Sequence, residues 1–354
     1  MMMFIIRALR ILKDALFASS LSLKTRCLML TLQPITLLTY AIEYLTSLKF
    51  PHSHEIRISL RNGERVRAVV YIPPTSQAQT QPQDPNGRKR VPLHLNIHGG
   101  AFLGGLPEAN ARFCHSLAQS GVLVVSSAYR YAPKHTFPVA HGDVCDVAVY
   151  LLGHAEELWG GEFEVDVEAF TVSGFSVGGN LALGIAQQLR NNDGEGDGKK
   201  NMDFRLPPQL KPKPEGFPKY DPLSFLMPLF DAYAGPNRIG DIDNPLLHPT
   251  LANIRTLPRN MSFVVGRNDI LLAETGEFVA RLEADAERIN GQRGLPGKEV
   301  DGRSIIVKSF VAEGMIHGWT EMPSFAINVE MRTKAFNKAI AFLRDVHGVY
   351  SSDA

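Results

Sequence analysis

Polar and apolar side chains begin to alternate after residue 51, and this alternation predicts β-strands. Residues 55–60 and 65–72 alternate on either side of Asn62-Gly63. Asn-Gly readily adopts the positive φ angles of a tight two-residue turn, so this dipeptide between two alternating runs is a strong hairpin signal. We therefore expect two antiparallel strands here.

Beyond the hairpin, short apolar runs alternate with segments whose apolar residues recur every three or four positions. The predicted strands cover residues 93–98, 122–129, 169–174, 223–230, 261–266 and 304–311. The predicted helices cover residues 109–120, 143–158, 178–190, 275–289 and 325–346. Strands that alternate with helices are typical of a parallel sheet flanked by helices. Together with the hairpin, they predict an α/β fold with a mostly parallel eight-stranded sheet.

Two segments have a different composition. Residues 191–222 hold six prolines among Gly, Asp and Lys residues, so we expect a flexible surface insertion. Residues 1–50 are apolar, but charges interrupt the first run. The second run, residues 27–42, is shorter than the about 20 residues that a spanning helix needs. We interpret residues 1–50 as an N-terminal helical cap on a main domain of residues 51–354, with a membrane-associated segment or a targeting peptide as alternatives.

Composition excludes several classes of function. The 37 Lys and Arg residues against 36 Asp and Glu residues give no broad positive surface for nucleic acid. Cys27, Cys114 and Cys145 have neither zinc-site spacing nor the pattern of a disulfide framework. The chain also lacks the glycine motifs of dinucleotide and phosphate sites. We expect no metal, no cofactor and a cytoplasmic protein, with membrane association through residues 1–50 as the alternative.

A candidate nucleophile lies where a predicted strand turns into a predicted helix. Residues 174–178 read Gly-Phe-Ser-Val-Gly. A serine in such a turn has a strained backbone that lifts its hydroxyl above the sheet, and the flanking glycines leave room for the turn. The motif alone is common by chance, but its place between a strand and a helix favours Ser176 as a nucleophile.

A second glycine motif, His-Gly-Gly-Ala-Phe at residues 98–102, directly follows a predicted strand. Acyl transfer builds negative charge on an oxygen atom, and free backbone N–H groups stabilise that charge. We expect Gly100 and Ala101 to be the main donors of an oxyanion hole. Gly99 would shape the loop, and Val177 would supply the third N–H group.

A serine nucleophile needs a base, and the base needs an orienting acid. His317 follows the last predicted strand and is the candidate base. Asp269 follows the strand at residues 261–266 and is the candidate acid, with Asp231 as the alternative. His98 is expected to brace the donor loop by hydrogen bonds. The loop histidines expected to face solvent are His52, His54, His135, His248 and His347.

The chain resembles the hormone-sensitive-lipase-like family of α/β-hydrolases, the carboxylesterase and lipase branch. The order Ser176, Asp269, His317 along the chain is the α/β-hydrolase order. The motifs run from about residue 90 to the C-terminus. They are residues 98–102, residues 129–133 with Phe137, Pro138 and Asp143, residues 174–180, and residues 269–271 with residues 317–319. The resemblance implies an α/β-hydrolase fold and a catalytic triad.

Three features depart from the family pattern. Phe175 stands where the family usually has Asp, and Ala101 replaces a third glycine. The family also inserts cap helices after the strand expected at residues 223–230, but here only residues 231–243 are available. Either the N-terminal helices cover the site, as we expect, or the site lies open. In the second helix, the apolar residues at helical spacing are Leu37, Ala41 and Leu45.

The resemblance implies a serine esterase that cleaves carboxylic esters of small or medium apolar substrates through an acyl-enzyme intermediate, without a cofactor. A thioesterase, acyl-transfer enzyme or lactone-forming tailoring hydrolase remains an alternative, because only the acceptor of the acyl group differs. A non-catalytic small-molecule receptor, like the gibberellin receptors that the same fold resembles, is a further alternative. Those receptors lack the catalytic histidine, which is present here as His317.

Overall fold

The computed structural model describes residues 9, 12–13, 16–17, 21–31, 33–74, 87–191, 212–217, 232–234, 240–292 and 304–348. The chain forms two compact units. Unit 1 comprises Met1–Ile185, Leu226–Ile239 and Leu343–Ala354, and unit 2 comprises Ala186–Phe225 and Gly240–Phe342.

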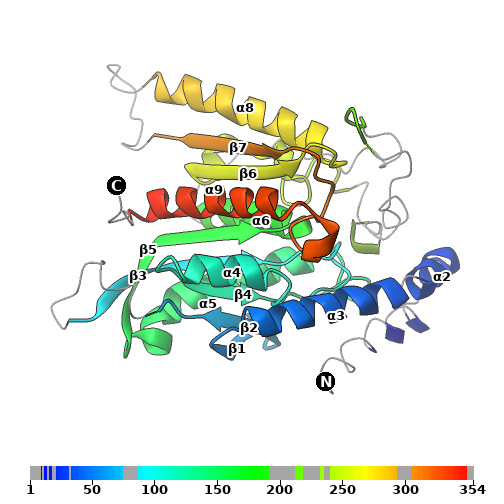
Figure 1. Ribbon diagram of the computed structural model, residues 1–354, viewed down its shortest axis with the longest axis horizontal. Coiled ribbons are helices and arrows are strands. Elements are labelled where there is room, and N and C mark those ends of the chain that lie inside the picture. Colours follow the sequence, from blue (N-terminus) through cyan, green and yellow to red (C-terminus); the bar gives the residue numbers. More distant parts are fainter. Residues whose placement is uncertain are drawn as a thin grey trace. The chain divides into compact units, whose positions relative to one another are not determined.

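Unit 1 contains a five-stranded mixed sheet (Figure 1). In spatial order its strands are β1 (His54–Ser59), β2 (Arg65–Tyr71), β4 (Leu123–Ser127), β3 (Lys89–Ile97) and β5 (Phe163–Gly174). The expected hairpin is confirmed, since β1 and β2 are antiparallel and Gly63 has a φ of 82° in the turn. Strand β2 is also antiparallel to β4, whereas β3 runs parallel to both β4 and β5.

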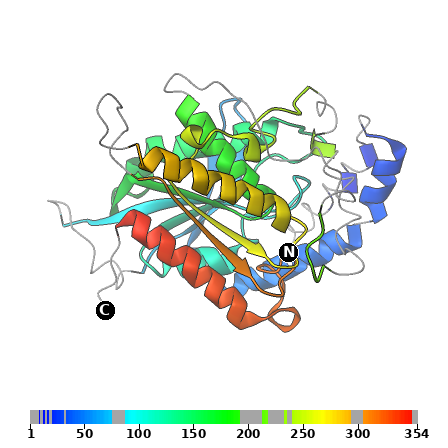
Figure 2. The ribbon, with the colours of Figure 1, turned by 90° about the horizontal axis from the view of Figure 1, so that it is seen from above.

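Helices cover both faces of this sheet. Helix α4 (Ala111–Ala118) lies on one face and α5 (Val139–Trp159) on the other (Figures 1 and 2). Helix α6 (Val177–Asn191) follows β5. All three form where the 3.6-residue pattern places them. Strand β3 is fully buried from Val91 to Ile97, as expected for a central strand between two helical layers.

The N-terminal segment is helical in α2 (Leu23–Thr31) and α3 (Gln33–Lys49), and α3 contacts α4. Among the residues of α3 whose burial is described, Tyr40 and Ser47 are buried, whereas Leu37 and Leu45 are exposed. That Leu37 and Leu45 line a cover over the site stays a prediction. Across the described parts of the chain, no helix combines the length and the apolar character needed to cross a membrane.

Unit 2 is built on two parallel strands, β6 (Asn260–Gly266) and β7 (Ile306–Ala312). Helix α8 (Leu272–Asn290) packs on one face through Phe278, whose ring lies 5.5 Å from that of Phe263. Helix α9 (Val329–His347) packs on the opposite face (Figure 2). There, buried Ala335 joins a cluster with Ala312 and Trp319.

The remaining elements of unit 2 are 3₁₀ turns. They are η3 (Pro249–Leu251), η4 (Ile254–Thr256) and η5 (Ser324–Ala326). The last helix was expected from residue 325, but η5 occupies that position and α9 begins at Val329. Seven of the eight expected strands lie in the described residues, five in one sheet and two in the other. The strand expected at residues 223–230 and most of the insertion expected at residues 191–222 lie outside them.

Candidate active site

The two glycine motifs of unit 1 leave the sheet at the same edge. Strands β3 and β5 are parallel neighbours, and Ile97 pairs with Gly174 at their carboxyl ends. The chain continues from these two residues into the loop at residues 98–102 and into the turn at residues 175–178. Parallel pairing therefore brings together two motifs that are far apart in the sequence.

The turn after β5 has the strained geometry expected of a nucleophile elbow. Ser176 has a φ of 53°, which is unusual for a residue other than glycine, and its side chain is exposed. A Cβ atom on Gly174 would lie 1.9 Å from the carbonyl oxygen of Gly178. A Cβ atom on Gly178 would lie 2.2 Å from the oxygen of Ile97. Both glycines are therefore required for this turn to pack on β3.

The loop after β3 lies directly against this elbow. A Cβ atom on Gly99 would lie 3.0 Å from the oxygen of Phe175 and 3.4 Å from Cβ of Ser176. Gly100 has a φ of 109°, and Ala101 continues the left-handed conformation with a φ of 54°. An alanine there carries strain of about 1 kcal/mol or more. The loop thus has an unfavourable backbone conformation, and its close contact with the elbow places its N–H groups beside the serine.

His98 braces the loop, as expected from its position. Its Nδ1 atom lies 2.6 Å from the oxygen of Gly99, and its Nε2 atom lies 3.1 Å from the hydroxyl of Tyr131. The imidazole stacks on the ring of Tyr129 at 4.7 Å. Burial lowers the pKa of His98 to about 4. The ring is therefore neutral near neutral pH and acts as a support for the loop.

A second support comes from the N-terminal helix α3 and was missed in the sequence. The hydroxyl of Tyr40 accepts a hydrogen bond of 2.8 Å from the N–H group of Gly105. The hydroxyl of Tyr131 donates one of 3.0 Å to the oxygen of the same glycine. Gly105 is therefore held from both sides of its backbone. A single tyrosine in an apolar helix has no local signal that would reveal such a contact.

The candidate acid and base of unit 2 are brought together in the same way as the glycine motifs. Gly266 pairs with Ala312 at the carboxyl ends of β6 and β7. The N–H group of Arg267 donates to the oxygen of Ala312 at 2.8 Å, and that of Asn268 donates to Met315 at 2.9 Å. A Cβ atom on Gly266 would lie 2.2 Å from the oxygen of Met315. The two loops that follow the strands are thus tied to each other.

Asp269 orients the imidazole of His317 from its loop. Nδ1 of His317 lies 3.0 Å from Oδ1 and 3.1 Å from Oδ2 of the carboxylate. The side chains are 21% and 8% exposed, respectively, so solvent screens the pair only in part. Burial alone lowers the pKa of His317. The hydrogen bond and negative charge of Asp269, together with Glu321 and Glu274, outweigh burial and raise this pKa above its ordinary value.

The predicted site residues therefore fall into two groups. Ser176 and Val177 lie in unit 1 with the donor loop of Gly99, Gly100 and Ala101. Asp269 and His317 lie in unit 2 and contact each other.

The alternative acid and two of the loop histidines differ from the residues of the candidate triad in their outcome. His347 was expected to face solvent, but its Nε2 atom lies 2.8 Å from the hydroxyl of Thr171 and burial lowers its pKa to about 4, so that prediction is wrong. The alternative acid, Asp231, lies outside the described residues. His248 was expected to face solvent, but its side chain is fully buried, so that prediction is wrong. It directly precedes η3, whose three residues are also buried, and this local packing encloses the imidazole.

Two buried histidines of unit 1 were not singled out by the sequence. His94 in β3 lies 2.8 Å from the hydroxyls of both Thr171 and Ser173 on the neighbouring strand β5. His141 in α5 lies 2.8 Å from Oδ1 of Asn180 and joins α5 to α6, the helix that follows Ser176. Both imidazoles are surrounded by protein and act as supports beneath the elbow.

Arg130 and Asp143, two residues of the motifs that carry the resemblance, form an ion pair with an N–O distance of 2.6 Å. The carboxylate is 1% exposed and also accepts the backbone N–H of Arg130. This pair fixes the turn after β4 on α5. Throughout the described ranges, no group of three His, Cys, Asp or Glu side chains is placed to hold a metal ion.

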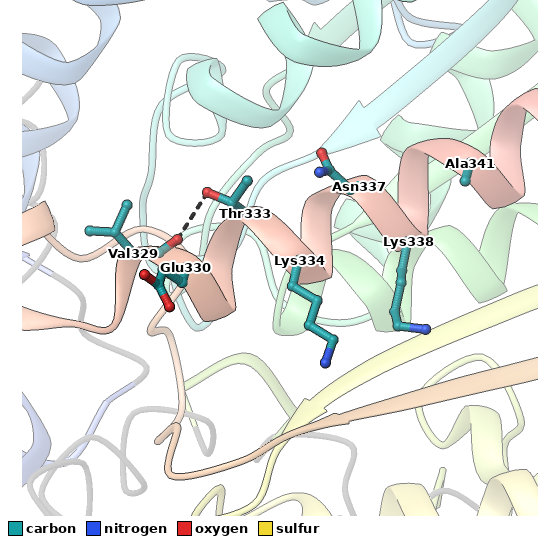
Figure 3. A pocket seen from close by; sticks show the side chains of 7 residues that line it. All are labelled: Val329, Glu330, Thr333, Lys334, Asn337, Lys338 and Ala341. Carbon is teal, nitrogen blue, oxygen red and sulfur yellow. Dashed lines mark hydrogen bonds between the residues drawn. The ribbon is translucent and has the colours of Figure 1, made fainter. Parts of the chain in front are cut away.

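A hollow of about 580 Å³ lies along α9 (Figure 3). Lys334 and Lys338 line it, and their ammonium groups lie 5.9 and 5.2 Å from the centre of the Phe310 ring. Thr333 donates its hydroxyl to the oxygen of Val329 within the same helix (Figure 3). None of the predicted catalytic or donor residues lines this hollow.

A protein-family model described as the alpha/beta hydrolase fold matches residues 94–294, more than half of the chain. An ethyl acetate hydrolase of Pseudomonas putida is 33% identical over 136 residues, which cover 38% of this chain and 38% of that protein. The FAD-linked oxidoreductase pytB of Aspergillus terreus is 30% identical over 201 residues, which cover 52% of this chain but 22% of that protein. The chain thus matches less than half of the length of either relative.

Among solved structures, the carboxylesterase EstE1, cloned from a metagenomic library, resembles this chain with a TM-score of 0.64. The match has 23% sequence identity and covers 87% of this chain and 96% of that chain. At this level of identity the likeness establishes the fold. The family match and the structural likeness together confirm the resemblance that the motifs suggested.

Proposed function

This chain belongs to the α/β-hydrolase family, and we propose that it hydrolyses carboxylic esters through an acyl-enzyme intermediate formed on Ser176. One observation carries the proposal. The loop of Gly99, Gly100 and Ala101 lies against an exposed serine whose backbone is strained, so a nucleophile and candidate oxyanion donors share one edge of the sheet.

In the proposed reaction, Oγ of Ser176 attacks the ester carbonyl carbon while Nε2 of His317 accepts the hydroxyl proton. The carbonyl π electrons move to the oxygen and form a tetrahedral oxyanion. Asp269 holds the imidazole through Nδ1 and stabilises the imidazolium that forms. The raised pKa of His317 fits this role, because the carboxylate favours the protonated ring.

The backbone N–H groups of Gly100, Ala101 and Val177 would donate hydrogen bonds to the oxyanion. Val177 is the first residue of α6, and the first N–H groups of a helix have no acceptor within the helix. Donors that are already in place need no reorganisation when the charge develops. The positive φ angles of Gly100 and Ala101 fix the local geometry of this loop before substrate arrives.

The tetrahedral intermediate collapses when its C–O bond to the alcohol breaks, and the imidazolium gives its proton to the leaving alkoxide. Water then attacks the acyl-enzyme, His317 again accepts a proton, and the acid is released as Ser176 regains its hydrogen. The proposed partners are small or medium apolar esters. Transfer to an acceptor other than water, or attack on a thioester or lactone, would use the same groups.

We also propose that residues 1–50 serve as an N-terminal cap and residues 51–354 as the catalytic domain. The hydrogen bond from Gly105 to Tyr40 supports this division, because it ties α3 to the donor loop.

The test uses p-nitrophenyl esters from acetate to palmitate, together with a fluorophosphonate that labels activated serines. Ser176→Ala should lower turnover by about 10³-fold or more and abolish labelling. Ser262→Ala, which removes an exposed serine of β6, is the matched control and should retain both. Labelling mapped to another serine would refute the assignment of Ser176. Activity confined to thioesters would refute ester hydrolysis while keeping the nucleophile.

A further inference from the structure

Helix α3 presents a continuous apolar strip to solvent. Its exposed apolar side chains are between 41% and 61% accessible, and they are Leu37, Leu38, Tyr44, Leu45 and Leu48. Successive residues of a helix are rotated by about 100°, so these five positions fall within an arc of about 120°. We call this set of five residues the α3 strip.

The side of α3 next to the strip has a different role. Tyr40 and Ser47 are buried there, and Tyr40 contacts the donor loop through Gly105. At about 100° per residue, Tyr40 lies about 40° from Tyr44 around the helix, so the strip borders this buried side and remains exposed beside it. In a soluble protein the apolar side of a helix normally faces the core. An apolar side that is exposed instead of buried indicates a binding partner outside the chain.

Exposed apolar residues are concentrated in this segment. The described residues include sixteen large apolar side chains that are exposed, and nine of them lie between Leu9 and Leu48. Large exposed apolar patches mark surfaces that bind proteins or membranes. The strip thus belongs to the region of the described chain that holds the most exposed large apolar side chains.

The charge of the same segment identifies the partner. Residues 1–50 hold six Lys and Arg residues against two Asp and Glu residues. The rest of the chain has 31 basic against 34 acidic residues, so the positive charge is local. Lys49, next to the end of the strip, is exposed. A second copy of the chain would bring two positive segments together, whereas an anionic surface would neutralise them.

We propose that the α3 strip binds the surface of an anionic lipid bilayer, with α3 lying in the plane of the interface. The leucines would enter the boundary between headgroups and acyl chains, and the exposed Lys49 beside them would contact lipid phosphates. The buried side of the same helix would keep its contact with Gly105. This inference does not depend on ester hydrolysis.

The experiment is vesicle flotation of the full chain at low ionic strength. Vesicles of phosphatidylcholine alone are compared with vesicles that contain phosphatidylglycerol. We expect flotation with the anionic vesicles and its loss at high salt. The double variant Leu38→Glu/Leu45→Glu should reduce the bound fraction at least tenfold. Val149→Glu, which alters an exposed apolar residue of α5, should bind like the unmodified chain.

Circular dichroism reports whether the double variant folds, and Leu38→Gln/Leu45→Gln provides a milder change if it does not. Equal flotation of the folded variant and the unmodified chain would overturn the proposal. The proposal would also be overturned if the unmodified chain did not float with vesicles and had the mass of a dimer in solution, and if the double variant had the mass of a monomer. That second result would assign the α3 strip to contact between two copies.

Discussion

The hydroxyl of Tyr40 and the backbone N–H of Gly105 are joined by a hydrogen bond of 2.8 Å. Tyr40 lies in the N-terminal helix α3, and Gly105 closes the loop that begins at His98. Residues 1–50 therefore contact the loop that carries the candidate oxyanion donors through a specific polar interaction at Gly105. Their effect on the reaction is expected to pass through the donor loop.

Tyr40→Phe should lower kcat at least about fivefold, with a smaller effect on KM. The substitution leaves the N–H of Gly105 without its acceptor, and an unsatisfied buried donor costs about 1–3 kcal/mol. Tyr44→Phe makes the same chemical change on the exposed side of α3 and should leave the kinetics unaltered. Steady-state kinetics on p-nitrophenyl butyrate compare the two. Equal kcat values for both variants would show that the contact does not hold the loop in its active form.

Asp269→Asn should lower kcat by about 10⁴-fold, because an amide at this position favours the wrong tautomer of His317. The backbone should be unaffected, since the N–H of Leu271 can still donate to the side-chain oxygen at position 269. Asp231→Asn is the control, because Asp231 is the alternative acid in the sequence. A greater loss in the Asp231 variant than in the Asp269 variant would reverse the assignment.

The sequence predicts the parts of the site whose chemistry restricts the choice of residue. Gly174 and Gly178 are found in the turn because any Cβ atom there would collide with backbone. Asp269 is identified because it follows a strand and precedes a histidine loop. The contact of Tyr40 could not be predicted, because it joins two segments that are 65 positions apart and neither has a motif for it.

The orientation of α3 illustrates a second limit. The spacing of its leucines correctly predicts a helix with one apolar side. Periodicity identifies which residues share a side but not what that side faces, so the exposure of Leu37 and Leu45 could not be predicted from their spacing. The burial of His248 was missed for a related reason, since position in a loop does not determine exposure.

The value of kcat/KM should rise with pH through an inflection above 6.5. His317 must be neutral to accept the proton of Ser176, and its contact with Asp269 raises its pKa above the ordinary value. Raising the pH therefore increases the active fraction. The rate profile of the unmodified enzyme from pH 5 to 9 gives the inflection directly. A flat profile over this range would exclude a histidine base.

The buried imidazole of His94 should make unit 1 sensitive to acid. Burial, with a smaller effect from the nearby His347, lowers the pKa of His94 to about 3. In the unfolded chain this pKa is near 6.5, so the unfolded state binds more protons at intermediate pH. The contribution of neutral His94 to stability is complete above about pH 6.5 and is lost as the pH falls toward 3. Over that range the slope is about 1.4 kcal/mol per pH unit.

His94→Gln should therefore reduce the acid sensitivity of folding, although it removes contacts with Thr171 and Ser173 and lowers stability at neutral pH. Urea unfolding at pH 7.5 and pH 5.0 gives the difference in free energy of unfolding between the two conditions. For His94→Gln this difference should be about 2 kcal/mol smaller than for the unmodified chain.

His54→Gln, at an exposed position of β1, should leave the difference unchanged because solvent surrounds that side chain. If His94→Gln and the unmodified chain lost the same free energy between these pH values, protonation of His94 would not be coupled to unfolding. Titrating groups that are not in contact with His94 or Thr171 contribute equally to all three chains. His347 shares Thr171 with His94 and its pKa is lowered to about 4 by burial, so His347→Gln measures its own part of the acid sensitivity.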